Sequence, residues 1–245
     1  MNKIMNQFQL ALIYTAVFLF TGAGATAQIG QPNKYGLVVI SNTSDLINSI
    51  GNDSSKIMVD LGKRIPGLVV DLRYAGTNNF MKEKLYPDEA RAWLRRVAAD
   101  SLVAVRNELK QYGLGLKIFD AYRPWSITEK MWEKVKDDRY AADPKKGSNH
   151  NRGIAVDLTI VDTDTGQEVD MGTGFDNFSD TAHHSFTGLF GTVRLARYVL
   201  KTVMEKHGFK ALETEWWHYS LSNVAGFELL DIGFDELNRL MLSAS

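Results

Sequence analysis

Apolar residues recur at helical spacing in two long stretches of the chain. The first runs from Pro87 to Lys110 and the second from Gly191 to His207, and glycines follow both stretches. A capping-box pair, Ser126 and Glu129, predicts that another helix starts at Ser126. Together with a short apolar stretch near the C-terminus, these patterns predict helices over residues 87–110, 126–135, 191–207 and 234–242.

Alternation of polar and apolar residues predicts strands between these helices. In residues 154–161, the larger apolar side chains share one face, while Ala155, Asp157 and Thr159 share the other. Further strands are predicted over residues 68–74, 116–120 and 216–221, and a hairpin-like turn at 162–167 leads into 168–171. Because strands and helices lack a regular βαβ rhythm, we predict an α+β fold: a single domain with a small, mostly antiparallel sheet flanked by helices.

The N-terminal residues have the pattern of a secretory signal peptide. A polar start with Lys3 precedes an apolar run, Leu10 to Phe20, and small residues that end at Ala27. The run is too short for a comfortable membrane span, and an uncleaved N-terminal anchor is the alternative. We therefore expect a signal peptide over residues 1–27, a mobile lead-in rich in Gly, Asn and Ser over 28–57, and the main folded domain over 58–245. Export would place the mature protein in the periplasm or outside the cell, without a membrane span.

Composition narrows the possible partners and cofactors. The chain has 28 basic and 29 acidic residues, a formal net charge of −1, which gives no reason to expect nucleic acid or anionic lipid as a partner. It contains no cysteine, so it needs no disulfide and offers no thiolate to a metal. A metal site in this protein must use histidine and carboxylate ligands.

Two short segments supply such ligands. Ser148 to Asp157 contains His150 and Asp157, and Glu215-Trp216-Trp217-His218 contains a second histidine and a glutamate. Catalytic zinc typically takes three ligands of these types and keeps a fourth position for water. We therefore predict one zinc ion per chain, bound by His150, Asp157 and His218, with Glu215 free to take a proton from the water.

The alternation of side chains along a strand restricts how these residues can reach one metal ion. His150 and Asp157 are separated by an odd offset, so on one continuous strand their side chains would point to opposite faces. A turn at Asn151 to Gly153 would bring His150 back over the face that carries Asp157. Glu215 and His218 are also separated by an odd offset, so we expect a bend or bulge near Glu215.

Several motifs together resemble the D-alanyl-D-alanine dipeptidase family of zinc peptidases. The S-x-H-x-x-G-x-A-x-D and E-x-W-H elements are shared with a wider group of related carboxypeptidases. The narrower signal is the combination of the N-N-F, D-A-Y-R-P and M-G-T-G-F-D segments. The matching segments run in family order over most of the chain: Val70–Tyr74, Asn78–Phe80, Asp120–Pro124, Ser148–Thr159, Met171–Asp176, His183–His184 and Glu215–Tyr219.

The resemblance implies roles for individual residues. His150, Asp157 and His218 would be the zinc ligands and Glu215 the catalytic base. Arg123 would stabilise the tetrahedral intermediate, while Ser148 and Asp176 would hold the substrate's free amino group. The chemistry agrees, because an arginine can bind a developing oxyanion and a carboxylate can pair with an ammonium. His183 and His184 are left without a role, and we interpret them as structural histidines.

The resemblance implies zinc-dependent hydrolysis of D-alanyl-D-alanine to free D-alanine, in cell-wall peptide turnover. The substrate partner would be a small D-amino-acid dipeptide. One alternative is a D,D-carboxypeptidase acting on longer peptidoglycan peptides. Another is a non-catalytic, zinc-containing wall-binding module, which would leave Glu215 and Arg123 without a purpose because zinc binding requires neither. The export signal favours a role in recycling wall fragments over the intracellular role of the family's resistance enzymes.

Overall fold

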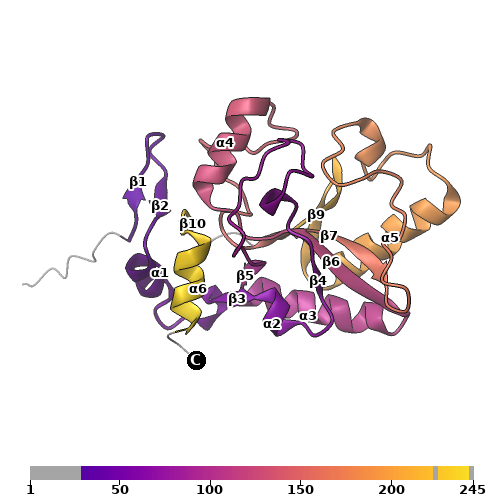
Figure 1. The fold of residues 1–245 in the computed structure, drawn as a ribbon, viewed down its shortest axis with the longest axis horizontal. Coiled ribbons are helices and arrows are strands. Elements are labelled where there is room, and N and C mark those ends of the chain that lie inside the picture. Colours follow the sequence, from indigo (N-terminus) through magenta and orange to yellow (C-terminus); the bar gives the residue numbers. More distant parts are fainter. Residues whose placement is uncertain (1–28, 223–225, 243–245) are drawn as a thin grey trace, which may run out of the picture.

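The computed structural model describes residues 29–222 and 226–242, so the predicted signal peptide lies outside the described residues. A five-stranded sheet with strand order β4-β6-β7-β9-β8 forms the centre of the molecule (Figure 1). Only the β4–β6 pair is parallel among these neighbours. The strands are β4 (Val69–Val70), β6 (Leu114–Asp120), β7 (Ala155–Asp162), β8 (Phe209–Leu212) and β9 (Glu215–Leu221).

Two helices pack side by side on one face of this sheet. α3 (Arg96–Lys110) and α5 (Gly191–Lys206) contribute Leu102, Val105 and Leu200 to the main hydrophobic core. Ile154, Val156, Leu158 and Ile160 belong to the same core, so Asp157 points to the opposite face because side chains alternate along a strand. The predicted α+β class, with a small and mostly antiparallel sheet flanked by helices, is confirmed.

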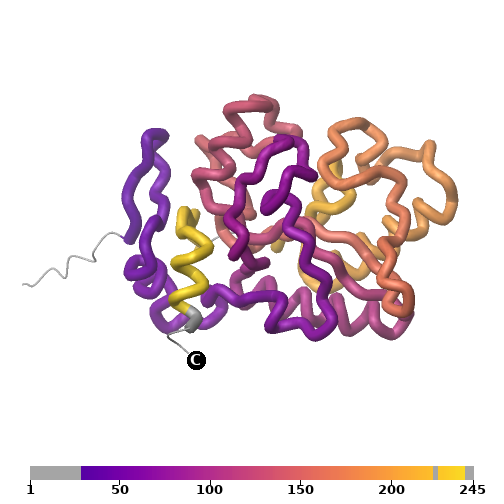
Figure 2. The backbone as a smooth tube through the Cα atoms, viewed as in Figure 1, coloured from indigo at the N-terminus to yellow at the C-terminus, as the bar shows by residue number. Residues whose placement is uncertain are grey.

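The segment before the main domain forms strands and a helix. The mobile lead-in expected over residues 28–57 is corrected accordingly. β1 (Gln31–Pro32), β2 (Val38–Ile40) and α1 (Thr43–Ile50) occupy most of it. β2 pairs in parallel with β10 (Leu229–Leu230), so the N-terminal and C-terminal segments lie side by side (Figure 2). The asparagines that suggested disorder instead stabilise turns: Asn33 accepts two backbone N–H groups, and Asn42 caps α1.

The helix predicted from Pro87 begins only at Arg96. Residues Trp93–Arg95 form β5, which pairs antiparallel with β3 (Met58–Asp60), and α2 (Leu61–Arg64) follows β3. Trp93, Leu94 and Arg95 are all buried, so consecutive side chains are enclosed on both sides. Pairing with a distant strand outweighs the local helical spacing here, because propensity is a weak guide where tertiary contacts compete.

Two further local predictions differ from the structure. α4 (Trp125–Val135) begins as predicted, but Ser126 makes no capping box; its N–H and hydroxyl both donate to Asp231 Oδ1, at 3.0 and 2.7 Å. The predicted strand at 68–74 is reduced to β4 and a 3₁₀ turn at Arg73–Ala75. The C-terminal helix α6 (Phe234–Leu242) has the predicted bounds.

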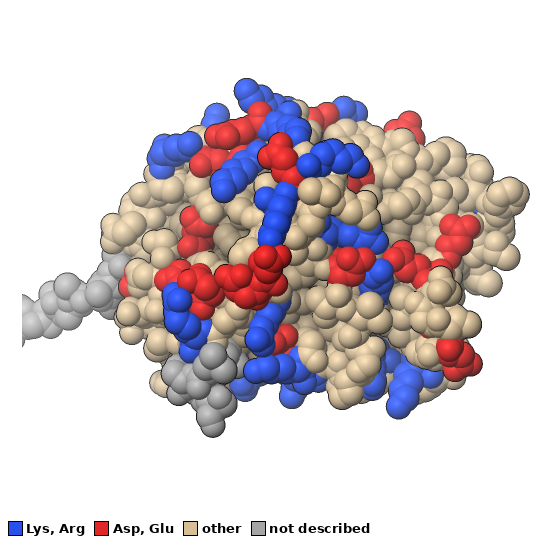
Figure 3. Space-filling view, in the orientation of Figure 1, with Lys and Arg blue, Asp and Glu red and all other residues tan. Residues whose placement is uncertain are grey.

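Basic and acidic side chains are interspersed on the face drawn in Figure 3. Among the described residues, no helix combines the length and apolar character needed to cross a bilayer.

Candidate metal centre and active site

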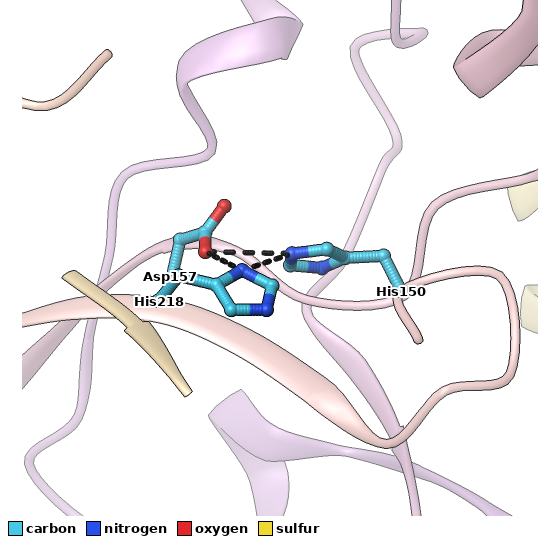
Figure 4. Close-up of side chains that lie close together, drawn as sticks. All are labelled: His150, Asp157 and His218. Carbon is cyan, nitrogen blue, oxygen red and sulfur yellow. Dashed lines mark hydrogen bonds and ion pairs between the residues drawn. The ribbon is translucent and has the colours of Figure 1, made fainter. Parts of the chain in front are cut away.

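His150, Asp157 and His218 meet at one point, as the sequence predicts. One potential ligand atom from each lies within 4.8 Å of the others. His218 Nδ1 is 2.9 Å from Asp157 Oδ1 and 3.2 Å from His150 Nε2, and His150 Nε2 is 3.4 Å from Asp157 Oδ1. Figure 4 shows the three side chains pointing toward one another.

The local backbone produces this convergence. Asp157 on β7 and His218 on β9 are direct partners in the antiparallel register. His150 lies in a turn that Gly153 closes with a φ of 69°, donating its N–H to His150 O at 3.0 Å. The turn expected at Asn151 to Gly153 is therefore confirmed. The irregularity expected near Glu215 is confirmed as well, because the β8–β9 register shifts next to that residue.

The donor set fits a zinc ion. The Nδ1–H of His150 donates to the carbonyl oxygen of Ala121 at 2.6 Å, which fixes the tautomer and leaves Nε2 free as a ligand atom. Burial alone would raise the pKa of Asp157, but His150 and His218 beside it lower the pKa below its usual value. The carboxylate is therefore held ionised, as a metal ligand must be.

Glu215 lies beside the three ligands without belonging to them. Its Oε2 is 4.0 Å from His218 Nδ1, and the side chain is buried. Burial raises the pKa of Glu215 to about 8 in the metal-free protein. A bound dication opposes this shift, so a loaded site brings the pKa closer to neutrality, where a general base works best.

Arg123 is held at the cavity by a carboxylate that the sequence analysis did not single out. Its Nε and Nη2 donate to Asp120 Oδ2 at 2.9 and 2.7 Å, and Nη2 is 3.8 Å from Asp157 Oδ2. Asp120 also accepts the hydroxyl of Tyr86 at 2.8 Å. Asp120 belongs to the same D-A-Y-R-P segment as Arg123, three residues before it. This short separation was the sequence feature that could have indicated the pair.

Asp176 occupies another wall of the cavity. Its carboxylate accepts the hydroxyl of Tyr74 at 3.0 Å and the N–H of Phe80 at 3.2 Å. Its backbone φ of 59° is unusual for a residue with a side chain, and such strain concentrates at functional sites. Burial raises the pKa of Asp176 to about 7.

One cavity brings all seven predicted site residues together. It has a volume of about 250 Å³, and Ser148 lines it beside the ligands, Glu215, Arg123 and Asp176. Tyr74 and Phe80 also line it, although the sequence analysis gave neither of them a role. Ligand sites for drug-sized molecules are usually about 300–1,000 Å³, so this cavity suits a smaller molecule.

His183 and His184 lie away from this cavity. His183 is 3.9 Å from Asp180, while the ring of His184 packs edge-on against Tyr219 at 6.2 Å. Burial lowers the pKa of His184 to about 4, which keeps it neutral. These surroundings agree with structural roles for both histidines.

An α+β domain that presents two histidines, one carboxylate and a separate glutamate to one small cavity defines a metallohydrolase. The sequence model of the Peptidase M15 family, described as D-ala-D-ala dipeptidase, matches residues 54–236. The chain belongs to this family of zinc-dependent peptidases.

Individual relatives agree with this assignment. The chain is 35% identical over 173 residues to the D-alanyl-D-alanine dipeptidase of Escherichia coli (strain K12), covering 71% of this chain and 89% of the relative. It is 29% identical over 180 residues to the D-alanyl-D-alanine dipeptidase of Enterococcus faecalis, covering 66% and 89%. Among solved structures, the LdcB LD-carboxypeptidase aligns over 89% of this chain and 94% of its own, at 16% identity and a TM-score of 0.40, too distant to support an argument.

Proposed function

We propose that the protein hydrolyses D-alanyl-D-alanine to two molecules of D-alanine. The observation that carries the proposal is the position of Asp176 in the same small cavity as Arg123 and the three metal ligands. An ammonium at Asp176 and a scissile carbonyl near Arg123 belong to the same residue of a dipeptide, so these two contacts fix the N-terminal residue of a short substrate. The relatives named D-alanyl-D-alanine dipeptidase support the choice of substrate.

The reaction adds water across the amide bond. When bound by His150, Asp157 and His218, zinc supplies Lewis acidity and lowers the pKa of water. Glu215 takes the proton from the attacking water and delivers it to the leaving amine nitrogen as the C–N bond breaks. Arg123 donates hydrogen bonds to the oxyanion that develops on the carbonyl oxygen, and burial strengthens this interaction.

The substrate's amino group is held by Asp176 and Ser148. Asp176 pairs with the ammonium, and Ser148 contributes a hydroxyl that already accepts the N–H of His150 at 3.2 Å. Because the cavity is small, a peptide extended beyond this ammonium has little room. This argument favours a dipeptidase over an enzyme that trims longer wall peptides.

A direct assay tests the proposal. The zinc-loaded protein, residues 28–245, is incubated with D-Ala-D-Ala, with L-Ala-L-Ala and with a wall pentapeptide ending in D-Ala-D-Ala. We expect free D-alanine from the first substrate and little product from the other two. Faster cleavage of the pentapeptide would establish a carboxypeptidase instead, and zinc binding without any hydrolysis would establish a binding module.

We also propose that the protein is exported and acts on D-Ala-D-Ala released from the cell wall. The support is the signal-like pattern of residues 1–27, with a short apolar run and a small-residue cleavage site. Cell fractionation with N-terminal sequencing tests this: we expect mature protein that begins at Gln28 in the periplasm. Full-length protein in the cytoplasm would contradict it.

A further inference from the structure

The N-terminal hairpin packs against the helix that leads into one wall of the cavity. We call Tyr35, Leu37, Val39, Trp125 and Leu229 the hairpin cluster, since these apolar side chains pack together apart from the two larger cores. The ring of Tyr35 meets that of Trp125 edge-on, with centroids 6.0 Å apart. Beside this contact, Lys34 Nζ is 2.9 Å from Glu129 Oε1 on α4.

The hairpin cluster touches the segment that forms this wall. We call residues 138–147 the pocket-wall loop, because Asp138 to Ala142 and Gly147 line the cavity. The indole N–H of Trp125 donates to the carbonyl oxygen of Pro144 at 3.2 Å. A Cβ on Gly147 would lie 2.6 Å from Leu229 Cδ2, so the Leu229 side chain presses closely on the loop just before Ser148.

A second connection runs through the backbone. β2 pairs with β10 through Val39↔Leu229 and Ile40↔Leu230. The N–H of Leu230 donates to the carbonyl oxygen of Asn151 at 2.9 Å, within the turn that carries His150. Hydrogen bonds thus join the hairpin to β10, and β10 to the turn that carries His150.

The hairpin lies outside the part of the chain that the family model matches. The family match begins at residue 54, whereas the hairpin occupies residues 31–40. The pocket-wall loop itself contains neither helix nor strand, and its order depends on turns and on what packs behind it. A segment that packs behind a substrate-binding loop affects how firmly that loop is held.

We propose that the N-terminal hairpin is a positioning element for substrate binding: through Tyr35 and Trp125 it holds the pocket-wall loop, and with it Ser148, against the bound dipeptide. Neither Tyr35 nor Trp125 lines the cavity that contains the metal ligands and Glu215. Loss of the Tyr35–Trp125 contact therefore weakens substrate binding and leaves the chemical step intact. The kinetic part of this proposal rests on the proposed dipeptidase function.

Two variants of the zinc-loaded protein test the proposal. Tyr35→Ala removes the ring that packs on Trp125, and Trp125→Phe keeps an aromatic ring but removes the N–H that binds Pro144. For both variants we expect KM for D-Ala-D-Ala to rise about tenfold and kcat per bound zinc to stay unchanged. The rise is smaller than the roughly 10²-fold loss that a 1 Å misplacement of a catalytic group can cause. Ile47→Ala is the matched control, because Ile47 lies in the same N-terminal segment with its side chain exposed.

Hydrogen exchange provides a readout that does not depend on activity. The N–H groups of Gly147 and Ser148 are bonded to Asp143 O and Asn151 Oδ1, at 3.1 and 2.8 Å. We expect both amides to exchange faster in Tyr35→Ala than in Ile47→Ala. A lower melting temperature with unchanged KM and unchanged exchange would overturn the proposal, since the hairpin would then only stabilise the fold. Faster exchange in a protein that does not cleave D-Ala-D-Ala would refute the proposed function and leave the positioning role standing.

Discussion

The charges around the cavity explain why the site requires a cation. The carboxyl groups of Asp120, Asp157, Asp176 and Glu215 lie around the buried guanidinium of Arg123. Asp120 already neutralises Arg123, and His150 and His218 pair with Asp157. Glu215 and Asp176 are left without a compensating charge of their own. The raised pKa values of Glu215 and Asp176, about 8 and about 7, reflect burial and this excess of negative charge. Zinc supplies the missing positive charge, which ties metal binding to the ionisation of the catalytic groups.

Replacing the proposed base separates metal binding from catalysis. Glu215→Gln keeps the shape of the side chain but cannot accept a proton. We expect kcat for D-Ala-D-Ala to fall by about 10²–10⁴-fold, the usual contribution of a general base, with the zinc content unchanged at one ion per chain. Steady-state kinetics and metal analysis of the same sample measure both quantities. Unchanged turnover would remove Glu215 from the mechanism.

Asp176 gives substrate binding a characteristic pH dependence. Its pKa of about 7 means that it gains the negative charge that pairs with an ammonium as the pH rises through neutrality. The ammonium of the substrate stays largely protonated below about pH 7.7. We therefore expect KM to fall between about pH 6 and about pH 7.5, and Asp176→Asn to have a higher KM without this trend. A parallel pH dependence in wild type and variant would assign the titration to another group.

At the scale of elements, the predictable parts are those with one dominant local signal. α5 carries a long amphipathic pattern and α6 a short one, and the β7 strand alternates cleanly, so the sequence predicts all three. The helix start at Pro87 and the Ser126 capping box were wrong because partners far along the chain, β3 and Asp231, supply better contacts. Likewise, ligand chemistry identified His150, but no sequence pattern indicates that Ala121 O orients it.

The cap that Asp231 provides for α4 has a measurable stability effect. Asp231 accepts both the N–H and the hydroxyl of Ser126 near the first turn of the helix, where backbone donors lack partners inside the helix. We expect Asp231→Ala to lower the free energy of unfolding by about 1 kcal/mol, the typical value of a lost cap. Asp88→Ala is the control, since its exposed carboxylate pairs only with Lys84 at the surface. Urea denaturation of the two variants should therefore give different midpoints.

At the scale of the whole molecule, distant parts of the chain meet around one site. Arg123 follows the end of β6, His150 lies in a turn before β7, and His218 lies on β9. The N-terminal hairpin and the C-terminal β10 meet behind the same cavity. Because the ligands come from separate elements that only the fold brings together, metal binding and global stability are linked.

This linkage predicts how zinc and pH together set stability. For Glu215 and Asp176 the folded-state pKa is raised above the usual value by burial, to about 8 and about 7. Their burial is tolerated while they are protonated and becomes costly as they ionise, so the metal-free protein loses stability as the pH rises from about 4 to about 8. Zinc opposes this loss because its positive charge stabilises the nearby ionised carboxylates. At 1,000 times its Kd, bound zinc adds about 4 kcal/mol to the free energy of unfolding. We expect the melting temperature of EDTA-treated protein to fall between about pH 5.5 and about pH 8, while the increase in melting temperature on adding zinc grows over the same range.

In metal-free Glu215→Gln the fall in melting temperature with pH should be shallower. An identical slope in that variant would show that Glu215 does not titrate in this range.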